Sequence, residues 1–255
     1  MKRGILRTHD ILRYARDANP VEEMLDGYLN YYFVMSSPDS SLPRIMLERG
    51  INAPANVHGP DGVRRPVVAL RSSPWKAGHA TNPWHDEFDL DDGHVRYYGD
   101  HKVDTPGSPG ATAGNKALLE AWHLYAGNSI EERLLAPPLL LFRSKTVERH
   151  GQTLVKGHVE FCGVGIIERL EHVVQQDTST GSSFPNLALE IAVIDASDHE
   201  GAIDMRWIDD RRNPALDALQ ANRHAPLPWS RWVREGRRAL PQVRRSVIPP
   251  TRTGA

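Results

Sequence analysis

Apolar residues recur at helical spacing near both ends of the chain and once in its middle, and elsewhere they form short continuous runs. The helical spacing covers residues 10–26, 115–125, 214–222 and 229–240. The continuous runs are rich in β-branched and aromatic residues, and they predict strands at residues 28–35, 66–70, 95–98, 138–144, 159–167 and 187–194. Strands that lie between helical ends indicate an α+β fold.

Charge is divided unevenly along the chain. The formal net charge is −1 over 255 residues, which by itself argues against a nucleic-acid partner. Residues 206–255, however, hold eleven arginines against four acidic residues, so this end carries +7 and the remainder carries −8. The basic end therefore suits a phosphate-facing surface, and the alternative is a solvated helical face followed by a loose tail.

Cysteine content and apolar run lengths restrict the compartment. Cys162 is the single cysteine, so the chain forms neither an internal disulfide nor a multi-cysteine metal site. Its apolar surroundings predict an inert core thiol in a reducing environment. No apolar run reaches the roughly 18 residues of a membrane span, and the first twenty residues become charged too early for a signal peptide. These features predict a cytoplasmic protein without a membrane partner.

The stretch 75–99 combines aromatic and acidic residues in a chain that is only 7% aromatic. Trp84, Tyr97 and Tyr98 bracket four aspartates at positions 86, 89, 91 and 92. Aromatic rings stack on a flat unsaturated ring, and a carboxylate accepts a hydrogen bond from its amino group. This combination is typical of a pocket that holds a nucleobase turned out of a duplex.

Four segments carry a resemblance to a known family: DEFDLDDGHVRYYGD, GNKALLEAW, FCGVGIIERL and FPNLALEIAVIDA. They resemble the DNA-recognition half of the modification-dependent restriction endonucleases of the MspJI and AspBHI group. The resemblance implies an SRA-like fold, named for SET- and RING-associated domains, in which a PUA-type curved β-barrel or crescent sheet is flanked by helices. On this basis residues 66–240 form the recognition domain, residues 1–65 an extension packed on it, and residues 241–255 a linker-like tail.

The resemblance also implies roles for residues of the aromatic stretch. In such domains a modified cytosine, such as 5-methylcytosine, leaves the duplex and lies between two aromatic rings. Tyr97 matches one of these rings, Trp84 is the candidate for the other, and Tyr98 joins the pocket. Asp86 is the candidate reader of the cytosine N4 amine, and Asp89 is its rival. Stacking contributes roughly 1–3 kcal/mol for any base, so the carboxylate supplies the choice of cytosine.

A second implied element is a finger that enters the duplex where the base has left. Gly114, Asn115 and Lys116 match it, and Ala117 stands where eukaryotic relatives carry an arginine. Residues that flank the proposed pocket are candidate phosphate contacts, namely Arg71, Ser73, Lys76 and Lys102.

Structural roles compete with several of these assignments. Trp84 and Tyr97 are alternatively core aromatics, and Asn115 is alternatively an N-cap for the following helix. The sequence Asp91-Asp92-Gly93 is typical of a turn. Trp229 and Trp232 are predicted to be packing residues.

Motifs for catalysis and metal binding are absent from the sequence. Restriction nuclease domains need an Asp followed by Glu-x-Lys or Gln-x-Lys, so that acidic groups hold Mg²⁺ near the scissile phosphate, and nothing here fits. The histidines lack the paired spacing of a zinc site. We therefore predict a recognition module that binds double-stranded DNA with modified cytosine and does not cut it, with no cofactor or metal of its own. A separate nuclease domain or subunit is the expected partner, and self-association is an option.

Two other functional classes fit the same residues. The first is a reader of RNA modifications, which would prefer single-stranded RNA to modified duplex DNA. The second is a small-molecule enzyme that uses Asp86 and His94 as base and acid, which would require an enclosed pocket away from basic surfaces.

Overall fold

The computed structural model describes residues 4–15, 18–37, 39, 42, 44–74, 85–177 and 180–246. Its strands are β1 (Ile5–Leu6), β2 (Ile11–Arg13), β3 (Met24–Leu25), β4 (Tyr28–Asn30), β5 (Ile51–Asn52), β6 (Val57–Gly59), β7 (Gly62–Arg64), β8 (Val68–Ser72), β9 (Glu87–Asp89), β10 (His94–Tyr98), β11 (Leu139–Ser144), β12 (Val147–Arg149), β13 (Gln152–Leu154), β14 (His158–Gln176), β15 (Ser183–Ile194) and β16 (Ile203–Asp204). Its helices are α1 (Tyr31–Met35), α2 (Ala113–Ala126), α3 (Ile130–Leu135), α4 (Arg206–Arg212), α5 (Ala218–Ala221), α6 (Leu227–Glu235) and α7 (Leu240–Val243), with 3-10 turns at η2 (Pro109–Ala111) and η3 (Gly236–Ala239).

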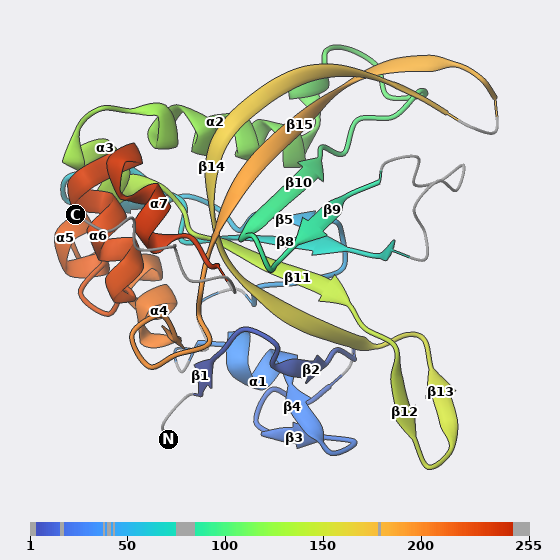
Figure 1. Ribbon diagram of the computed structural model, residues 1–255. Coiled ribbons are helices and arrows are strands. Elements are labelled where there is room, and N and C mark those ends of the chain that lie inside the picture. Colours follow the sequence, from blue (N-terminus) through green and yellow to red (C-terminus); the bar gives the residue numbers. More distant parts are fainter. Residues whose placement is uncertain are drawn as a thin grey trace, which may run out of the picture.

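A ten-stranded mixed sheet forms the centre of the molecule, and β14 is its longest strand (Figure 1). The first part of β14 pairs with β2 and β11, and its later part pairs with β15, which continues to β10 and β9. On the other side β11 pairs in parallel with β8, and β8 pairs with β5. Figure 1 shows β14 and β15 curving together away from helices α3 to α7, which gather beside one end of the sheet.

The predicted α+β class is confirmed, whereas a closed barrel is not. Among the described residues, the pairing leaves β3, β5 and β9 as ends of the sheet. At Gly163 the φ angle is 122°, and a Cβ atom there would lie 2.8 Å from the carbonyl oxygen of Ile194. Glycine therefore allows β14 to bend tightly against β15 near the irregular register opposite Leu141/Phe142.

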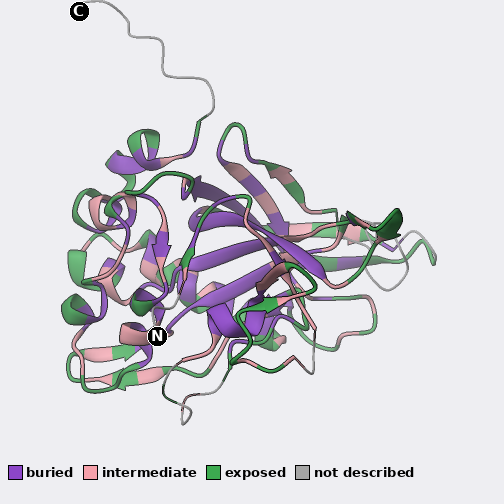
Figure 2. Cartoon of the chain, turned by 90° about the horizontal axis from the view of Figure 1, so that it is seen from below, coloured by how far each residue is buried: buried purple, intermediate pink, exposed green. Residues whose placement is uncertain are grey.

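Burial explains why the long strands form where the sequence predicts them. Residues 158–167 of β14 are all buried, whereas residues 168–176 are partly or fully exposed. A strand buried on both faces is a continuous apolar run, and a strand with one open face alternates. Figure 2 shows the buried residues concentrated in the central strands and in α1. The core also includes Cys162 and a packed group of Trp207, Trp229 and Trp232, which confirms the predicted core position of the cysteine and the packing role of the last two tryptophans.

The prediction of a helix over residues 10–26 is wrong. This span contains β2 and β3, and Leu12 of β2 is fully buried opposite Val159 of β14. Pairing with the central sheet therefore decides the conformation of a span whose local spacing resembles a helix. In residues 28–35 the predicted strand ends at Asn30, whose side chain accepts a hydrogen bond from the Tyr32 amide and starts α1.

Helices near the C-terminal end are shorter than predicted. The predicted helix over residues 229–240 is divided at Gly236, whose φ angle of 64° ends α6. Of residues 214–222 only α5 is helical, and α4 precedes them. Residues 241–246 of the predicted tail pack on the sheet, because Val243 is buried and Arg244 bridges to Ile194. In the described part of the chain, no helix is long and apolar enough to cross a membrane.

Candidate functional site

Asp86 lies just before β9, beside the ends of β8 and β10. Its Oδ1 accepts a hydrogen bond of 3.0 Å from the backbone N–H of Tyr98, and its side chain also bonds to that of Ser72. The residue is half-buried, and burial raises the pKa of its carboxyl to about 6, against the opposing effect of these two hydrogen bonds. A fixed carboxyl that is costly to ionise is therefore present where the sequence predicts a base-reading group.

Tyr97 adjoins this carboxyl but is covered. Its side chain belongs to the hydrophobic core, and the residue is only 3% exposed. The hydroxyl donates a 3.3 Å hydrogen bond to the Arg71 carbonyl. Burial, followed by the nearby Asp86 charge, raises the pKa of Tyr97 well above its usual value. Tyr97 is thus a core aromatic in this conformation, and a base would reach its ring only after covering groups move.

The other predicted pocket residues on β9 and β10 have side chains with partners of their own, although the Tyr98 backbone N–H bonds to Asp86. The Tyr98 ring is half-buried, and the Arg96 guanidinium lies 5.5 Å from its centroid and donates to its hydroxyl at 3.1 Å. Asp89 is exposed at the end of β9, where its Oδ1 accepts from the backbone N–H of Asp92 at 3.3 Å. Residues 91–93 form a turn with Gly93 at a φ angle of 60°, as predicted. Trp84 and Lys76 lie outside the described residues.

Gly114, Asn115 and Lys116 lie in the first turns of α2 and do not form a loop. Asn115 is fully buried: its amide nitrogen donates to the Pro109 carbonyl at 2.8 Å, and its Oδ1 accepts from the Asp100 N–H at 2.9 Å. The N-cap of α2 is Thr112, and Asn115 lies inside the helix, so the N-cap interpretation of Asn115 is wrong. With its amide enclosed, Asn115 is not available to an orphaned base in this conformation.

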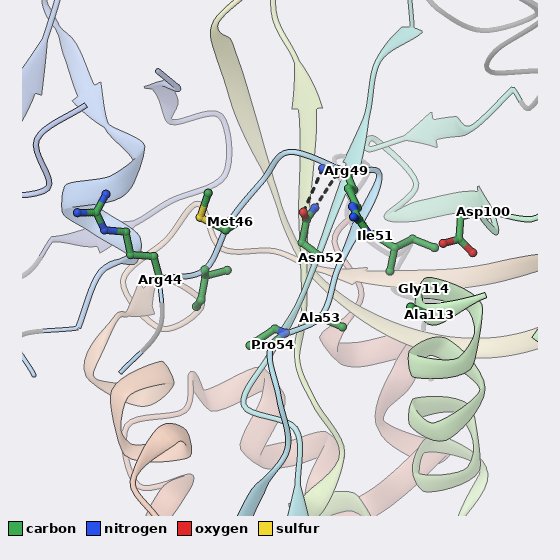
Figure 3. A pocket seen from close by; sticks show the side chains of 11 residues that line it. Arg44, Met46, Arg49, Ile51, Asn52, Ala53, Pro54, Asp100, Ala113 and Gly114 are labelled. Carbon is green, nitrogen blue, oxygen red and sulfur yellow. Dashed lines mark hydrogen bonds between the residues drawn. The ribbon is translucent and has the colours of Figure 1, made fainter. Parts of the chain in front are cut away.

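A cavity of about 250 Å³ lies beside the start of α2, and Figure 3 shows its lining. Gly114 and Asp100 form one side, and the segment that carries Arg44, Arg49 and Asn52 forms the other. Asp100 is engaged by the helix, because its Oδ1 accepts from the Asn115 N–H at 3.1 Å and also from the Thr112 hydroxyl. The acidic side of this cavity therefore serves mainly to cap α2.

Two of the predicted phosphate contacts share a second cavity of about 230 Å³. Arg71 and Ser73 line it together with Ser144, Tyr14 and Lys156. The Oγ atoms of Ser73 and Ser144 are 3.0 Å apart, and the Arg71 guanidinium lies 5.8 Å from the centroid of the Tyr14 ring. The cavity is thus polar and cationic. Lys102 is exposed in the segment after β10.

The arginine-rich end is only in part a solvated surface. Arg211 is fully buried and donates to the carbonyl oxygens of Arg65, Pro66 and several residues near the end of α3. Burial, followed by the nearby Arg64 charge, lowers the pKa of Arg211 to about 9. Arg212 and Arg245 are also buried. These three arginines hold the fold together, which the count of charges along the sequence does not reveal.

Asp86 and His94 are held by different partners. His94 Nε2 lies 2.6 Å from Glu190 Oε2, whereas Asp86 is bonded to the β10 backbone and Ser72. This separation gives no support to an acid and base pair made of these two residues. Within the described ranges, no group of three or more His, Cys, Asp or Glu residues is placed to hold a metal ion.

Sequence reasoning missed Glu160, a buried carboxylate on β14 that contacts three basic side chains. Its partners come from positions 9, 143 and 145, so no local motif marks the group. The available signal was a single acidic residue inside an otherwise apolar run, since such a residue needs partners when it is buried.

Comparison with known proteins identifies the family. The family described as "Restriction endonuclease AspBHI N-terminal" matches residues 59–243. The chain belongs to this family. A solved structure of MspJI restriction endonuclease in complex with a 27-mer oligonucleotide is 59% identical, with a TM-score of 0.90. The match covers 100% of this chain and 56% of the MspJI chain, so this member of the AspBHI N-terminal family spans little more than half of that enzyme.

More distant structures share the fold of this AspBHI N-terminal family member. The DNA recognition domain of the cytosine modification-dependent restriction endonuclease LpnPI is 16% identical with a TM-score of 0.61, over 98% of this chain and 94% of that domain. The DNA modification-dependent restriction endonuclease AspBHI is 18% identical with a TM-score of 0.59, over 92% of this chain and 51% of AspBHI. No curated protein sequence matches the chain.

Proposed function

We propose that this protein binds double-stranded DNA that contains a modified cytosine, 5-methylcytosine first, as the recognition part of a modification-dependent restriction endonuclease. The observation that carries the proposal is the 59% identity to MspJI, which extends over the whole chain with a TM-score of 0.90. A fold relative, the LpnPI domain, is itself a DNA recognition domain.

Asp86 is the proposed reader of the flipped cytosine. With a pKa of about 6 the carboxyl is about nine-tenths ionised at pH 7, so it accepts a hydrogen bond from the N4 amine. Its Oδ1 is already held by the Tyr98 N–H, which fixes the orientation of the group before a base arrives. Asp89 is the less favoured reader, since it is exposed and engaged in a turn.

The finer features of the fold and the pocket belong to the same proposal. We propose that the curved sheet is an SRA-type scaffold, with Tyr97 and Trp84 as the two faces of the base sandwich. The proximity of Tyr97 to Asp86 supports this arrangement. Because the Tyr97 ring is covered here, base entry would involve movement of its surroundings, which include Gly50 and the Arg71 carbonyl.

Cleavage is assigned to a separate nuclease domain or subunit. The Mg²⁺ that such a nuclease uses needs clustered carboxylates next to a lysine. Neither the sequence nor the described residues provide that set, so the residues present do not fit this metal. The recognition part on its own is therefore expected to bind modified DNA without cutting it.

A fluorescence-anisotropy titration tests the proposal. The purified chain is titrated with one labelled duplex that carries either cytosine or 5-methylcytosine at a single position, with 2-aminopurine beside that position to report unstacking. Asp86→Asn keeps the acceptor for the Tyr98 N–H but can place an amide donor against the N4 amine, so we expect the preference for methylated DNA to fall by at least tenfold. Asp92→Asn, in the exposed turn, is the matched control.

The outcomes separate the candidate functions. A preference for the methylated duplex that Asp86→Asn removes and Asp92→Asn retains supports the proposal. Equal affinity for both duplexes contradicts it, and stronger binding of single-stranded RNA of the same sequence favours the RNA-reader alternative.

A further inference from the structure

Adjacent strands place a polar row across one face of the sheet. In the strand register Ser72 of β8 lies opposite Arg143 of β11, and Arg143 lies opposite Glu160 of β14. Directly paired residues project from the same face, with neighbouring strands about 4.8 Å apart. Ser72, to which Asp86 bonds, is therefore about two strand spacings from Glu160.

Glu160 is the centre of a charged group on this face. It is 3% exposed, and its Oε2 lies 3.1 Å from both Arg143 Nη2 and Lys145 Nζ. Its Oε1 lies 2.7 Å from His9 Nδ1. Burial alone would raise the pKa of this carboxyl, but the three hydrogen bonds outweigh it and lower the pKa to about 2. The carboxylate is therefore ionised throughout the physiological range.

His9 extends the group to the other end of the chain. Its Nε2 lies 3.0 Å from Arg245 Nη2, and Nε and Nη1 of Arg245 have no hydrogen-bond partner among the described residues. His9 itself has a φ angle of 75°, a left-handed conformation that is costly for a residue with a side chain. Its backbone N–H is held by the Phe161 carbonyl at 2.8 Å. A strained residue that is fixed at both backbone and side chain is typical of a functional position.

The cluster has more positive charge than its carboxylate neutralises. Arg143, Lys145 and Arg245 stand against one Glu160, an excess of two positive charges. The side chains of Arg143 and Lys145 are 30% and 41% exposed, so their remaining donors face solvent. One cation is enough to balance the charge of one buried carboxylate. Glu160 contacts two permanent cations, so it also fixes the positions of their charged groups at the surface.

We infer that Arg143 and Lys145, oriented by Glu160, bind the DNA backbone phosphates that flank the base read at Asp86. This inference rests on the proposed function and assigns contacts beyond Arg71, Ser73, Lys76 and Lys102. The chemistry is that of a phosphodiester: Arg and Lys supply charge-assisted hydrogen bonds to phosphate oxygens and carry no base preference. Arg143 is the register partner of Ser72, about one strand spacing of 4.8 Å away, and Lys145 follows two residues later along the chain.

Salt dependence distinguishes phosphate contacts from a structural ion-pair group. The affinity for the methylated duplex is measured at several NaCl concentrations for the full chain, for Lys145→Gln and for Arg143→Gln. Each lost phosphate contact reduces the slope of log affinity against log salt by about 0.9, and weakens binding roughly eightfold at about 0.1 M salt. The preference for methylated over unmodified duplex is expected to stay unchanged, because both duplexes lose the same contact.

Arg231→Gln is the matched control, since Arg231 is an exposed arginine that pairs with Glu235 within α6. Slopes that fall for Lys145→Gln and Arg143→Gln but not for Arg231→Gln support the inference. If both variants keep the wild-type slope and the wild type prefers methylated DNA, the inference is wrong and the proposed function is retained. Absence of that preference in the wild type contradicts the proposed function instead, so the two failures are distinguishable. Circular dichroism of each variant checks that the fold is retained, because each substitution at Arg143 or Lys145 removes one of the three hydrogen bonds to the buried Glu160 carboxylate.

Discussion

Asp86→Asn is expected to stabilise the protein at neutral and alkaline pH while it removes the recognition of cytosine. The carboxyl has a pKa of about 6 when folded and a reference value of 3.8. An acid whose pKa is raised by folding contributes stability that is fully present below the unfolded pKa and is lost as the pH rises through the folded pKa. The wild type therefore loses this contribution between about pH 4 and pH 7, and the variant has none to lose.

The magnitude follows from the two pKa values. Between pH 4.5 and pH 8 the wild type should lose about 2 kcal/mol relative to Asp86→Asn, beyond any pH dependence that both proteins share. For a domain of this size that difference corresponds to a shift in Tm of about 4–8 °C. The amide of the variant retains the acceptor for the Tyr98 N–H, so the comparison isolates the cost of the buried charge.

Urea unfolding, followed by tryptophan fluorescence, measures this difference, because three tryptophans lie in the core. The free energy of unfolding is determined at pH 4.5, 6 and 8 for the wild type, for Asp86→Asn and for Asp89→Asn. Asp89 is exposed, so its variant should follow the wild type within about 0.5 kcal/mol at each pH. A constant difference between Asp86→Asn and wild type at all three values would refute the reasoning, since it would show that the Asp86 carboxyl ionises as easily in the fold as outside it.

Three further predictions concern residues with enclosed polar groups. Arg211→Met should lower the free energy of unfolding in urea by at least about 3 kcal/mol, because several buried carbonyl oxygens lose their donor. A decrease below about 1 kcal/mol would mean that water replaces the guanidinium as their donor. Asn115→Ala should lower the free energy of unfolding by about 2–4 kcal/mol, since it removes the hydrogen bonds to Pro109 and Asp100. Unchanged stability would show that the fold does not need this amide, which would leave it available to bind DNA. The Cys162 thiol, buried and with its pKa raised to about 12 by burial, should react with a thiol reagent at pH 8 only after unfolding, and rapid labelling of the native protein would contradict its burial.

The central strands were predictable because burial on both faces leaves a continuous apolar run. This is the pattern of β11, of the first half of β14 and of β15, and the predicted spans fall within or largely coincide with the observed strands. The outer half of β14 was not predicted, since its residues alternate in exposure and include charges. The helix prediction for residues 10–26 was wrong because two short strands reproduce helical spacing by chance. Their conformation is decided by pairing with distant or neighbouring strands, β2 with β14 and β3 with β4.

The candidate site was predictable where its residues are close in sequence. Asp86, Tyr97 and Tyr98 lie within thirteen positions, and the structure places Asp86 close to both tyrosines of β10. The orientation of the Asn115 side chain could not be predicted from the sequence Gly-Asn-Lys, because these three residues are compatible with a loop and with the start of a helix. Glu160 was missed for a different reason, since its partners are distributed along the chain from position 9 to position 145.

The length of β14 has a consequence for local unfolding. At about 3.3 Å per residue its nineteen residues measure about 60 Å along the strand, and one continuous backbone joins Glu160 to the tip of the β15 hairpin. The pairing partners of β14 include β2, near the start of the chain, and β15, which ends at Ile194, so loosening one part of β14 removes hydrogen bonds from elements far apart in sequence. We therefore expect the central strands to open as one cooperative unit, with hydrogen exchange equally slow in β2, β11 and the paired part of β14.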